Sequence, residues 1–179
     1  QMVRWYVSAS DVAGNRTRFP AFSNRLRSPE FEGTVVADPS LTNPLPVLHF
    51  FVQNPAAADS ASTRCSLAYN GEFYDNVIVS VHGQSSLEFP KHSYNFDMNP
   101  GFRFQYDPKE DRVDDFNILT TYPDKAKVRN ILAYETYHDA GHAYHKVIPI
   151  RMQRNAAFLG DLNFVEDGSE HFLKRVGLN

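Results

Sequence analysis

The residue best suited to chemistry in this sequence is Lys91, which opens a predicted strand over 91–98. In that segment Tyr94 and Phe96 share an apolar face with Met98, and Lys91 has the parity of the polar face. A cation carried on a strand can neutralise phosphate, because phosphoryl transfer depends mainly on positioning and charge. A solvated lysine on an edge strand explains the same pattern, and the neighbouring residues alone favour that simpler interpretation.

Two further groups could bind phosphate. The turn made of Gly83, Gln84, Ser85 and Ser86 offers backbone N–H groups and hydroxyls. It departs from the common glycine-rich phosphate patterns, however, and an ordinary polar turn is favoured on local grounds. Arg129 lies in the first turns of a predicted helix, where it could contact phosphate or hold the helix against the hairpins. We favour the structural role.

That predicted helix runs over about 125–140, with Asp124 as its N-cap. Extending its apolar stripe by one turn reaches Glu135 and His138. Since a helix carboxylate can orient a strand lysine, we hypothesise an ion pair between Lys91 and Glu135. An exposed helix glutamate at the end of the stripe explains the pattern as well.

Histidines near the end of this helix invite a zinc interpretation. Glu135, His138 and His142 have spacings that a metal-binding helix could use, and His145 follows. Gly141 interrupts the helix between them, and no His-Glu-x-x-His order is present. We therefore predict no metal site here.

The elements that must position these residues are mostly hairpins. Residues 47–52 predict a buried strand, and Asn70-Gly71 predicts a tight turn between strands at 65–69 and 72–82. A further hairpin is predicted over 146–153 and 157–166, around a turn at 154–156. We therefore predict an α+β fold in which antiparallel β-hairpins pack on one main helix.

The first residues have a different organisation. Residues 1–22 alternate in period two and turn at Ala13-Gly14-Asn15, which resembles the closing hairpin of a fibronectin-type or immunoglobulin-like β-sandwich repeat. So short a segment cannot form a sandwich alone. We interpret 1–22 as the remnant of such a domain, 23–46 as a proline-containing linker and 47–179 as the main domain. Neither end has a natural boundary, so we expect a piece of a longer protein.

Composition excludes several classes of protein. The chain is 42% hydrophobic, with 14 Phe and 9 Tyr, which indicates a globular fold. A net charge of −3 argues against nucleic-acid binding, because phosphate neutralisation needs a basic surface. No apolar run reaches the roughly 18–20 residues of a membrane span. The single cysteine, Cys65, excludes an intrachain disulfide.

Five short motifs, in order, resemble the N-terminal half of the CotH kinase family, atypical kinases first recognised in spore coats. The motifs are Val81-His-Gly-Gln-Ser-Ser86, Pro90-Lys-His-Ser-Tyr94, Ile118-Leu-Thr-Thr-Tyr-Pro-Asp124, Arg129-Asn-Ile-Leu-Ala133, and Asn155-Ala-Ala-Phe-Leu-Gly160 followed by Glu166. The chain departs from the family pattern at Gln84, His92 and Ala156. These departures put intact activity in doubt.

The resemblance implies phosphorylation of a protein with ATP and Mg, in a secreted, cell-surface or other extracytoplasmic setting. Lys91 and, by analogy with ordinary kinases, Glu135 would then be catalytic. Gly83, Gln84, Ser85, Ser86, Lys91 and Arg129 would bind the nucleotide. The metal-binding acids of the family lie in a later segment. We therefore expect this chain alone to be inactive and to bind neither ATP nor Mg tightly.

A non-catalytic alternative stays open. The chain could be a cell-surface adhesion or structural module that keeps the fold without catalysis, and the β-sandwich resemblance of its first residues suits such an architecture. The expected partner is accordingly a protein substrate or a surface partner, and a zinc hydrolase built on the histidines is a remote third class.

Overall fold

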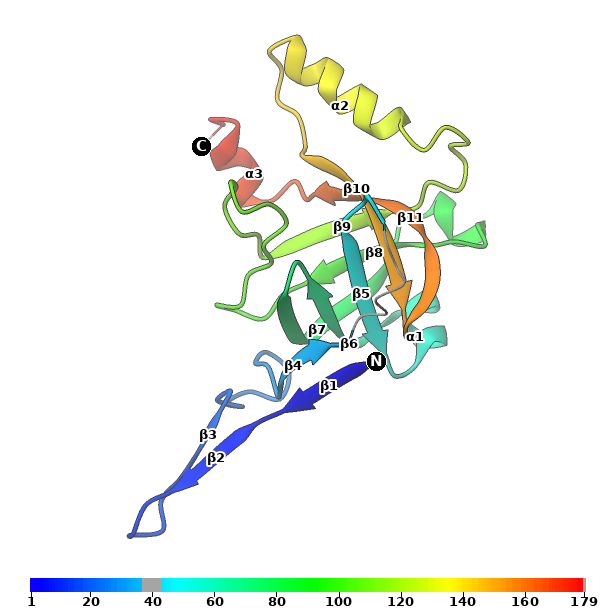
Figure 1. Ribbon diagram of the computed structural model, residues 1–179. Coiled ribbons are helices and arrows are strands. Elements are labelled where there is room, and N and C mark those ends of the chain that lie inside the picture. Colours follow the sequence, from blue (N-terminus) through cyan, green and yellow to red (C-terminus); the bar gives the residue numbers. More distant parts are fainter. Residues whose placement is uncertain (37–42, 179) are drawn as a thin grey trace.

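The computed structural model describes residues 1–36 and 43–178, and it is built around a closed β-barrel (Figure 1). The barrel strands in chain order are β5 (Val47–Val52), β6 (Ser62–Tyr69), β7 (Glu72–His82), β8 (Ser93–Asp97), β9 (Asp115–Leu119), β10 (Val147–Arg154) and β11 (Ala157–Glu166). Around the barrel the order is β10-β11-β9-β8-β7-β6-β5. Neighbours are antiparallel, except that β10 and β5 run parallel and close the ring.

The predicted α+β fold was therefore wrong. The hairpins do not pack on a helix, because they bury their apolar faces against one another inside the barrel. Asn155 assists the closure: its side chain accepts a hydrogen bond from the Val52 N–H (3.0 Å) and donates one to the Val52 carbonyl (2.9 Å). This amide extends the pairing of two strands that lie far apart in the sequence.

Aromatic rings fill the barrel. Phe116 lies at the centre, with its ring centroid 4.2 Å from that of Phe104, 5.1 Å from Phe96 and 5.4 Å from Phe164. All four rings are buried. Inward side chains of the alternating strands therefore make a continuous core, and the barrel has no open lumen.

A short helix, α1 (Pro55–Ser60), packs against β6 and β7. Its Ala58 is fully buried, and its Asp59 accepts hydrogen bonds from the Tyr94 hydroxyl and from Arg154, both at 2.6 Å. Burial and the Asp59 hydrogen bond raise the pKa of Tyr94 well above its usual value. The network joins α1 to β8 and β10.

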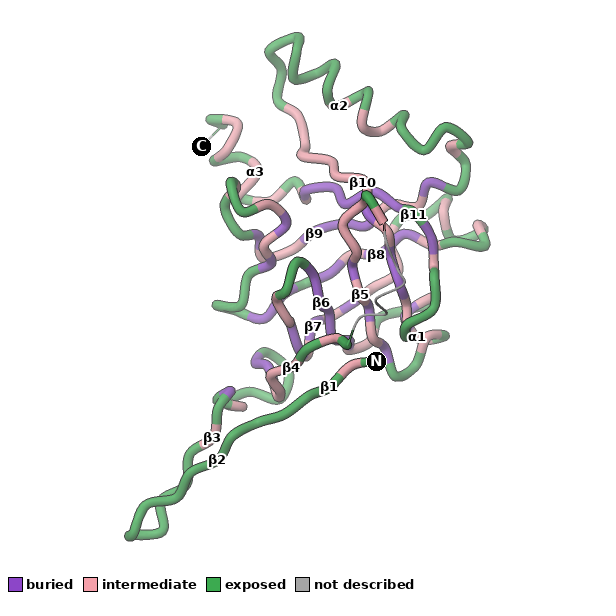
Figure 2. Tube along the Cα trace, viewed as in Figure 1, coloured by how far each residue is buried: buried purple, intermediate pink, exposed green. Residues whose placement is uncertain are grey.

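The first strands form an arm that projects from the barrel (Figure 1). In it β1 (Met2–Trp5) pairs with β4 (Glu32–Val35), and β2 (Val7–Ser10) pairs with β3 (Arg16–Phe19). Most of the arm is exposed on both faces, whereas the barrel is largely buried (Figure 2). Strand β4 falls within the predicted linker, and the assignment of 1–22 to a β-sandwich stays a prediction.

The main helix, α2 (Arg129–Asp139), begins later than the sequence predicts. Asp124 does not cap it. Instead, Val128 is the N-cap residue, and the Asp124 carboxylate accepts the N–H groups of Ala126 in the preceding turn (3.0 Å) and of Arg129, the first residue of the helix (2.8 Å). Helix α2 contacts β10 from outside the barrel and buries none of its residues, and Leu132 of the predicted apolar stripe is 55% exposed.

Two further short helices complete the described elements: the 3₁₀ helix η1 (Ser85–Glu88) and α3 (Glu170–Arg175). Arg175 of α3 forms an ion pair with the buried Glu166 at the end of β11, and this pair anchors α3 to the barrel. Among the described residues, no helix combines the length and the apolar character that crossing a membrane requires.

Candidate functional site

Lys91 lies at the rim of the barrel, two residues before β8 begins. The predicted strand over 91–98 therefore starts late, although its apolar face of Tyr94, Phe96 and Met98 is buried as predicted. The Lys91 ammonium lies 5.6 Å from the ring centroid of Phe158 on β11. Lys91 is exposed and forms no ion pair with any residue that the structure describes.

A second cation, which the sequence analysis did not single out, lies over the same Phe158 ring. The Arg151 guanidinium of β10 lies 4.2 Å from the Phe158 ring centroid. Its Nε is buried without a hydrogen-bond partner in the described chain. Because Arg151 is one of two arginines in an alternating strand, only the pairing of β10 with β11 reveals its neighbourhood.

Gly160 leaves room for this arrangement. A Cβ added at Gly160 would lie 3.1 Å from the Lys91 ammonium nitrogen and 3.3 Å from Leu162 of the core. Any larger residue would therefore push against Lys91 from one side and the barrel core from the other. We call Lys91, Arg151, Phe158 and Gly160 the rim site.

The turn of Gly83, Gln84, Ser85 and Ser86 is exposed for most of its length, and Gly83 has a φ of +82°. The Ser86 hydroxyl donates to the His82 carbonyl at 2.8 Å, so it serves the turn itself. Backbone N–H groups and the exposed side chains of Gln84 and Ser85 are what this turn can offer a ligand.

Arg129 and Glu135 lie apart from Lys91 in their interactions. Arg129 pairs with Asp124, with Nε to Oδ1 at 3.4 Å, and its N–H bond lowers the pKa of Asp124. Glu135 is exposed on α2. The hypothesised Lys91–Glu135 ion pair is not formed in the described part of the chain, because α2 lies outside the closed barrel instead of under its hairpins.

The histidines at the end of α2 do not gather into a metal site with other described residues. His138 lies 3.0 Å from its neighbour Asp139, and its ring stacks edge-on with Tyr144 at 4.7 Å between centroids. Among residues 1–36 and 43–178, no group of three or more His, Cys, Asp or Glu side chains is placed to hold a metal ion.

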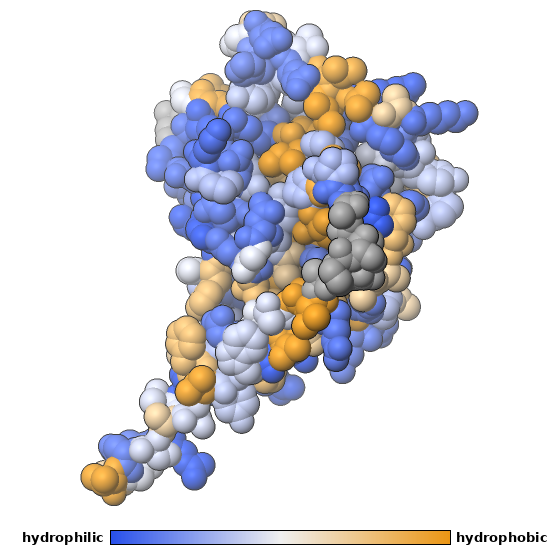
Figure 3. Space-filling view, viewed as in Figure 1, coloured by the Kyte–Doolittle hydropathy of each residue, from blue (hydrophilic) through white to orange (hydrophobic). Residues whose placement is uncertain are grey.

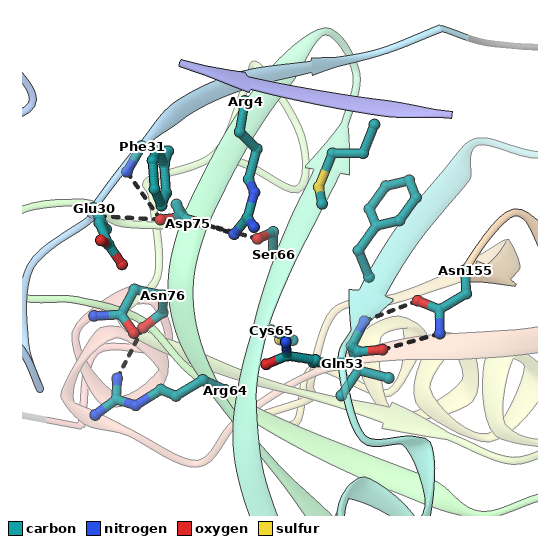
Figure 4. A pocket seen from close by; sticks show the side chains of 13 residues that line it. Arg4, Glu30, Phe31, Gln53, Arg64, Cys65, Ser66, Asp75, Asn76 and Asn155 are labelled. Carbon is teal, nitrogen blue, oxygen red and sulfur yellow. Dashed lines mark hydrogen bonds and ion pairs between the residues drawn. The ribbon is translucent and has the colours of Figure 1, made fainter. Parts of the chain in front are cut away.

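A cavity of about 440 Å³ lies between the arm and the barrel (Figure 4). In its wall Asp75 accepts hydrogen bonds from the N–H groups of Glu30 and Phe31, both at 3.0 Å, and from the Ser66 hydroxyl at 2.7 Å. The neighbouring Cys65 is buried, which raises the pKa of its thiol well above the usual value. These saturated or inert groups join the arm to the barrel, and they offer no reactive atom.

The comparison with protein families identifies the chain. Residues 79–179, just over half of the sequence, match the family described as CotH kinase protein, and the chain belongs to this family. The matched region runs from β7 to α3 and includes the whole rim site. A comparison with curated proteins found no match. The family predicted from the five motifs is thus confirmed.

Proposed function

We propose that this chain holds the phosphates of ATP for an atypical protein kinase, with Lys91 and Arg151 as the phosphate-binding cations. The observation that carries the proposal is the convergence of these two cations on Phe158 within the region matched to the family. A triphosphate carries several negative charges, and phosphoryl transfer depends on offsetting them.

The two side chains would act differently. The Lys91 ammonium is a compact charge with three donors, whereas the Arg151 guanidinium presents a planar fork that fits two phosphate oxygens. Phe158 lies against both cations, and Gly160 keeps the space that Lys91 occupies. Positioning and charge neutralisation are the contributions that these residues would make.

The rim site of Lys91, Arg151, Phe158 and Gly160 contains no carboxylate, so it offers Mg none of the oxygen ligands that this ion prefers. We therefore assign no step to Mg within the described chain. The protein substrate, and a secreted or cell-surface location, remain part of the proposal on family membership alone.

The test is labelled-phosphate transfer from ATP by the natural protein that contains this chain. We expect Lys91→Ala and Arg151→Ala each to lower transfer by about tenfold or more, since each removes a charge from the transition state. Lys125→Ala is the matched control, because Lys125 is an exposed lysine in the turn before α2. Unchanged transfer in both rim variants would overturn the assignment.

A second candidate is the non-catalytic surface module. The exposed arm favours it, because an element with apolar side chains in solvent suits binding better than catalysis. The same assay separates the two functions: a natural protein without measurable transfer, whose binding to its partner depends on the arm, would support the module.

A further inference from the structure

The arm presents an apolar side to solvent. Val3, Trp5, Val7 and Phe19 are between 44% and 64% exposed, and Val7 lies opposite Phe19 across the β2–β3 ribbon. In the part of the chain that the structure describes, β2 and β3 pair only with each other. A two-stranded ribbon is marginally stable in water, so this element gains from covering its apolar side.

The arm is also basic. Residues 1–36, which include β4, contain five arginines and three acids, Asp11, Glu30 and Glu32, which gives a formal charge of +2. Since the whole chain carries −3, residues 37–179 carry −5. Two of these arginines lie over aromatic rings of the arm, Arg4 at 4.8 Å from the Phe31 centroid and Arg18 at 4.2 Å from the Tyr6 centroid. Hydrophilic and apolar residues thus occur together on one projecting element (Figure 3).

The barrel carries a strip of opposite charge. Asp97 of β8 pairs in register with Asp115 of β9, and Asp167 follows β11 beside them. Burial and the neighbouring Asp167 carboxylate raise the pKa of Asp115 to about 6. Arg103 and His171 both pair with the neighbouring carboxylate of Asp114. The acidic strip, made of Asp97, Asp115 and Asp167, therefore has no cationic partner in the described chain.

We propose that the arm is a dimerisation element, which docks on the acidic strip of a second copy of this chain. The opposite charges of arm and barrel favour this occupant over an unrelated protein. The arm points away from its own barrel (Figure 1), and Asp75 holds it in that direction, so contact occurs between copies. Each copy would give one arm and receive one, as two-fold symmetry requires.

Charge-exchange variants test this proposal by sedimentation velocity. We expect the unaltered chain to dimerise and to dissociate as salt is raised from about 0.05 M to about 0.5 M, because salt screens exposed charges. Arg16→Glu on the arm and Asp97→Lys on the strip should each weaken dimerisation by about tenfold or more. An equimolar mixture of the two variants should restore it, since each altered arm then meets an altered strip.

Lys125→Glu is the control, because it makes the same charge change away from both surfaces and should leave dimerisation unchanged. All these side chains are exposed, and circular dichroism should show the same fold in each variant. A chain that stays monomeric at about 100 µM, where even a weak dimer forms, overturns the proposal. So does a dimer that survives both single variants, or one that the mixture fails to restore.

Discussion

The barrel and the arm are built from the same kind of alternating strand, but only the barrel buries its apolar side chains. Phe116 of β9 is fully buried, whereas Phe19 of β3 is 64% exposed. Strand β9 pairs on both edges and faces a closed interior, while β3 has a single neighbour among the described strands. Burial therefore follows from the number of sheet partners, and not from the alternation itself.

The largest expected effect comes from Phe116→Ala, which should lower the free energy of unfolding by about 3–5 kcal/mol because it opens a cavity among stacked rings. The matched arm variant Phe19→Ala should change it by less than about 0.5 kcal/mol, since its ring is mostly in solvent. Urea denaturation measures both. Similar losses in the two variants would contradict the contrast between barrel and arm.

The second-largest loss of stability is expected at the junction between the arm and the barrel. Asp75→Ala leaves the N–H groups of Glu30 and Phe31 without their acceptor, and we expect a loss of about 2 kcal/mol. Hydrogen exchange should accelerate most at these two amides, because the arm detaches first. Alanine at the exposed Asp111 is the control. Exchange that stays slow at both amides would show that other contacts hold the arm.

Two turn glycines, one in the barrel and one in the arm, test whether the two regions unfold together. Gly71 in the β6–β7 turn and Gly14 at the arm tip both have a φ of +84° and open space at the Cβ position. Gly71→Ala should cost about 1 kcal/mol from the strained conformation. Gly14→Ala should cost clearly less in global unfolding, since local fraying of the arm relieves the strain. Equal costs would mean that the arm unfolds together with the barrel.

The smallest effect concerns the outer face of the barrel and depends on pH. The pKa of Asp115, about 6, lies above its usual value near 3.8, so the folded state binds this proton more tightly than the unfolded state. Ionised Asp115 therefore costs stability, with no cost below pH 3.8, a rising cost up to about pH 6 and the full cost above it.

Asp115→Asn should accordingly be more stable than the unaltered chain at pH 7.5, by about 0.5–1 kcal/mol after allowing for solvent screening of this half-exposed group. The difference should vanish by about pH 3, where the Asp115 carboxyl is neutral in both the folded and the unfolded chain. Denaturant midpoints across this range measure it, with the same substitution at exposed Asp111 as control. A difference that does not depend on pH would exclude the carboxylate as its cause.

Several elements were predictable because their signals are local. Strand β5 occupies the predicted residues 47–52, and the Asn70-Gly71 turn has the positive φ values, 48° and 84°, that its residue types favour. The hairpin around 154–156 was also predicted, although Ala156 takes a φ of +69° without being glycine. Period and turn chemistry depend on neighbours in the sequence, so sequence patterns capture them.

The helix and the candidate site were harder to predict. Asp124 looks like an N-cap, but its carboxylate stabilises a preceding turn, and the helix starts only at Arg129. Lys91 was identified, whereas Arg151 was missed because nothing adjacent in the sequence marks it. Its place beside Phe158 arises from the register of β10 with β11, which sets Arg151 opposite Asp161 and Gln153 opposite Phe158, so that Arg151 meets the Phe158 ring diagonally.

The sequence by itself determined the family, several of the barrel strands and their tight turns, since these depend on residue types at short spacing. The tertiary structure decided that the hairpins close into a barrel, that α2 lies outside it and that Lys91 lies with Arg151 and not with Glu135. The physical reason is the parallel pairing of β10 with β5, which joins segments about a hundred residues apart, as the Asn155–Val52 bond illustrates with its separation of 103. No local pattern encodes a contact of that range.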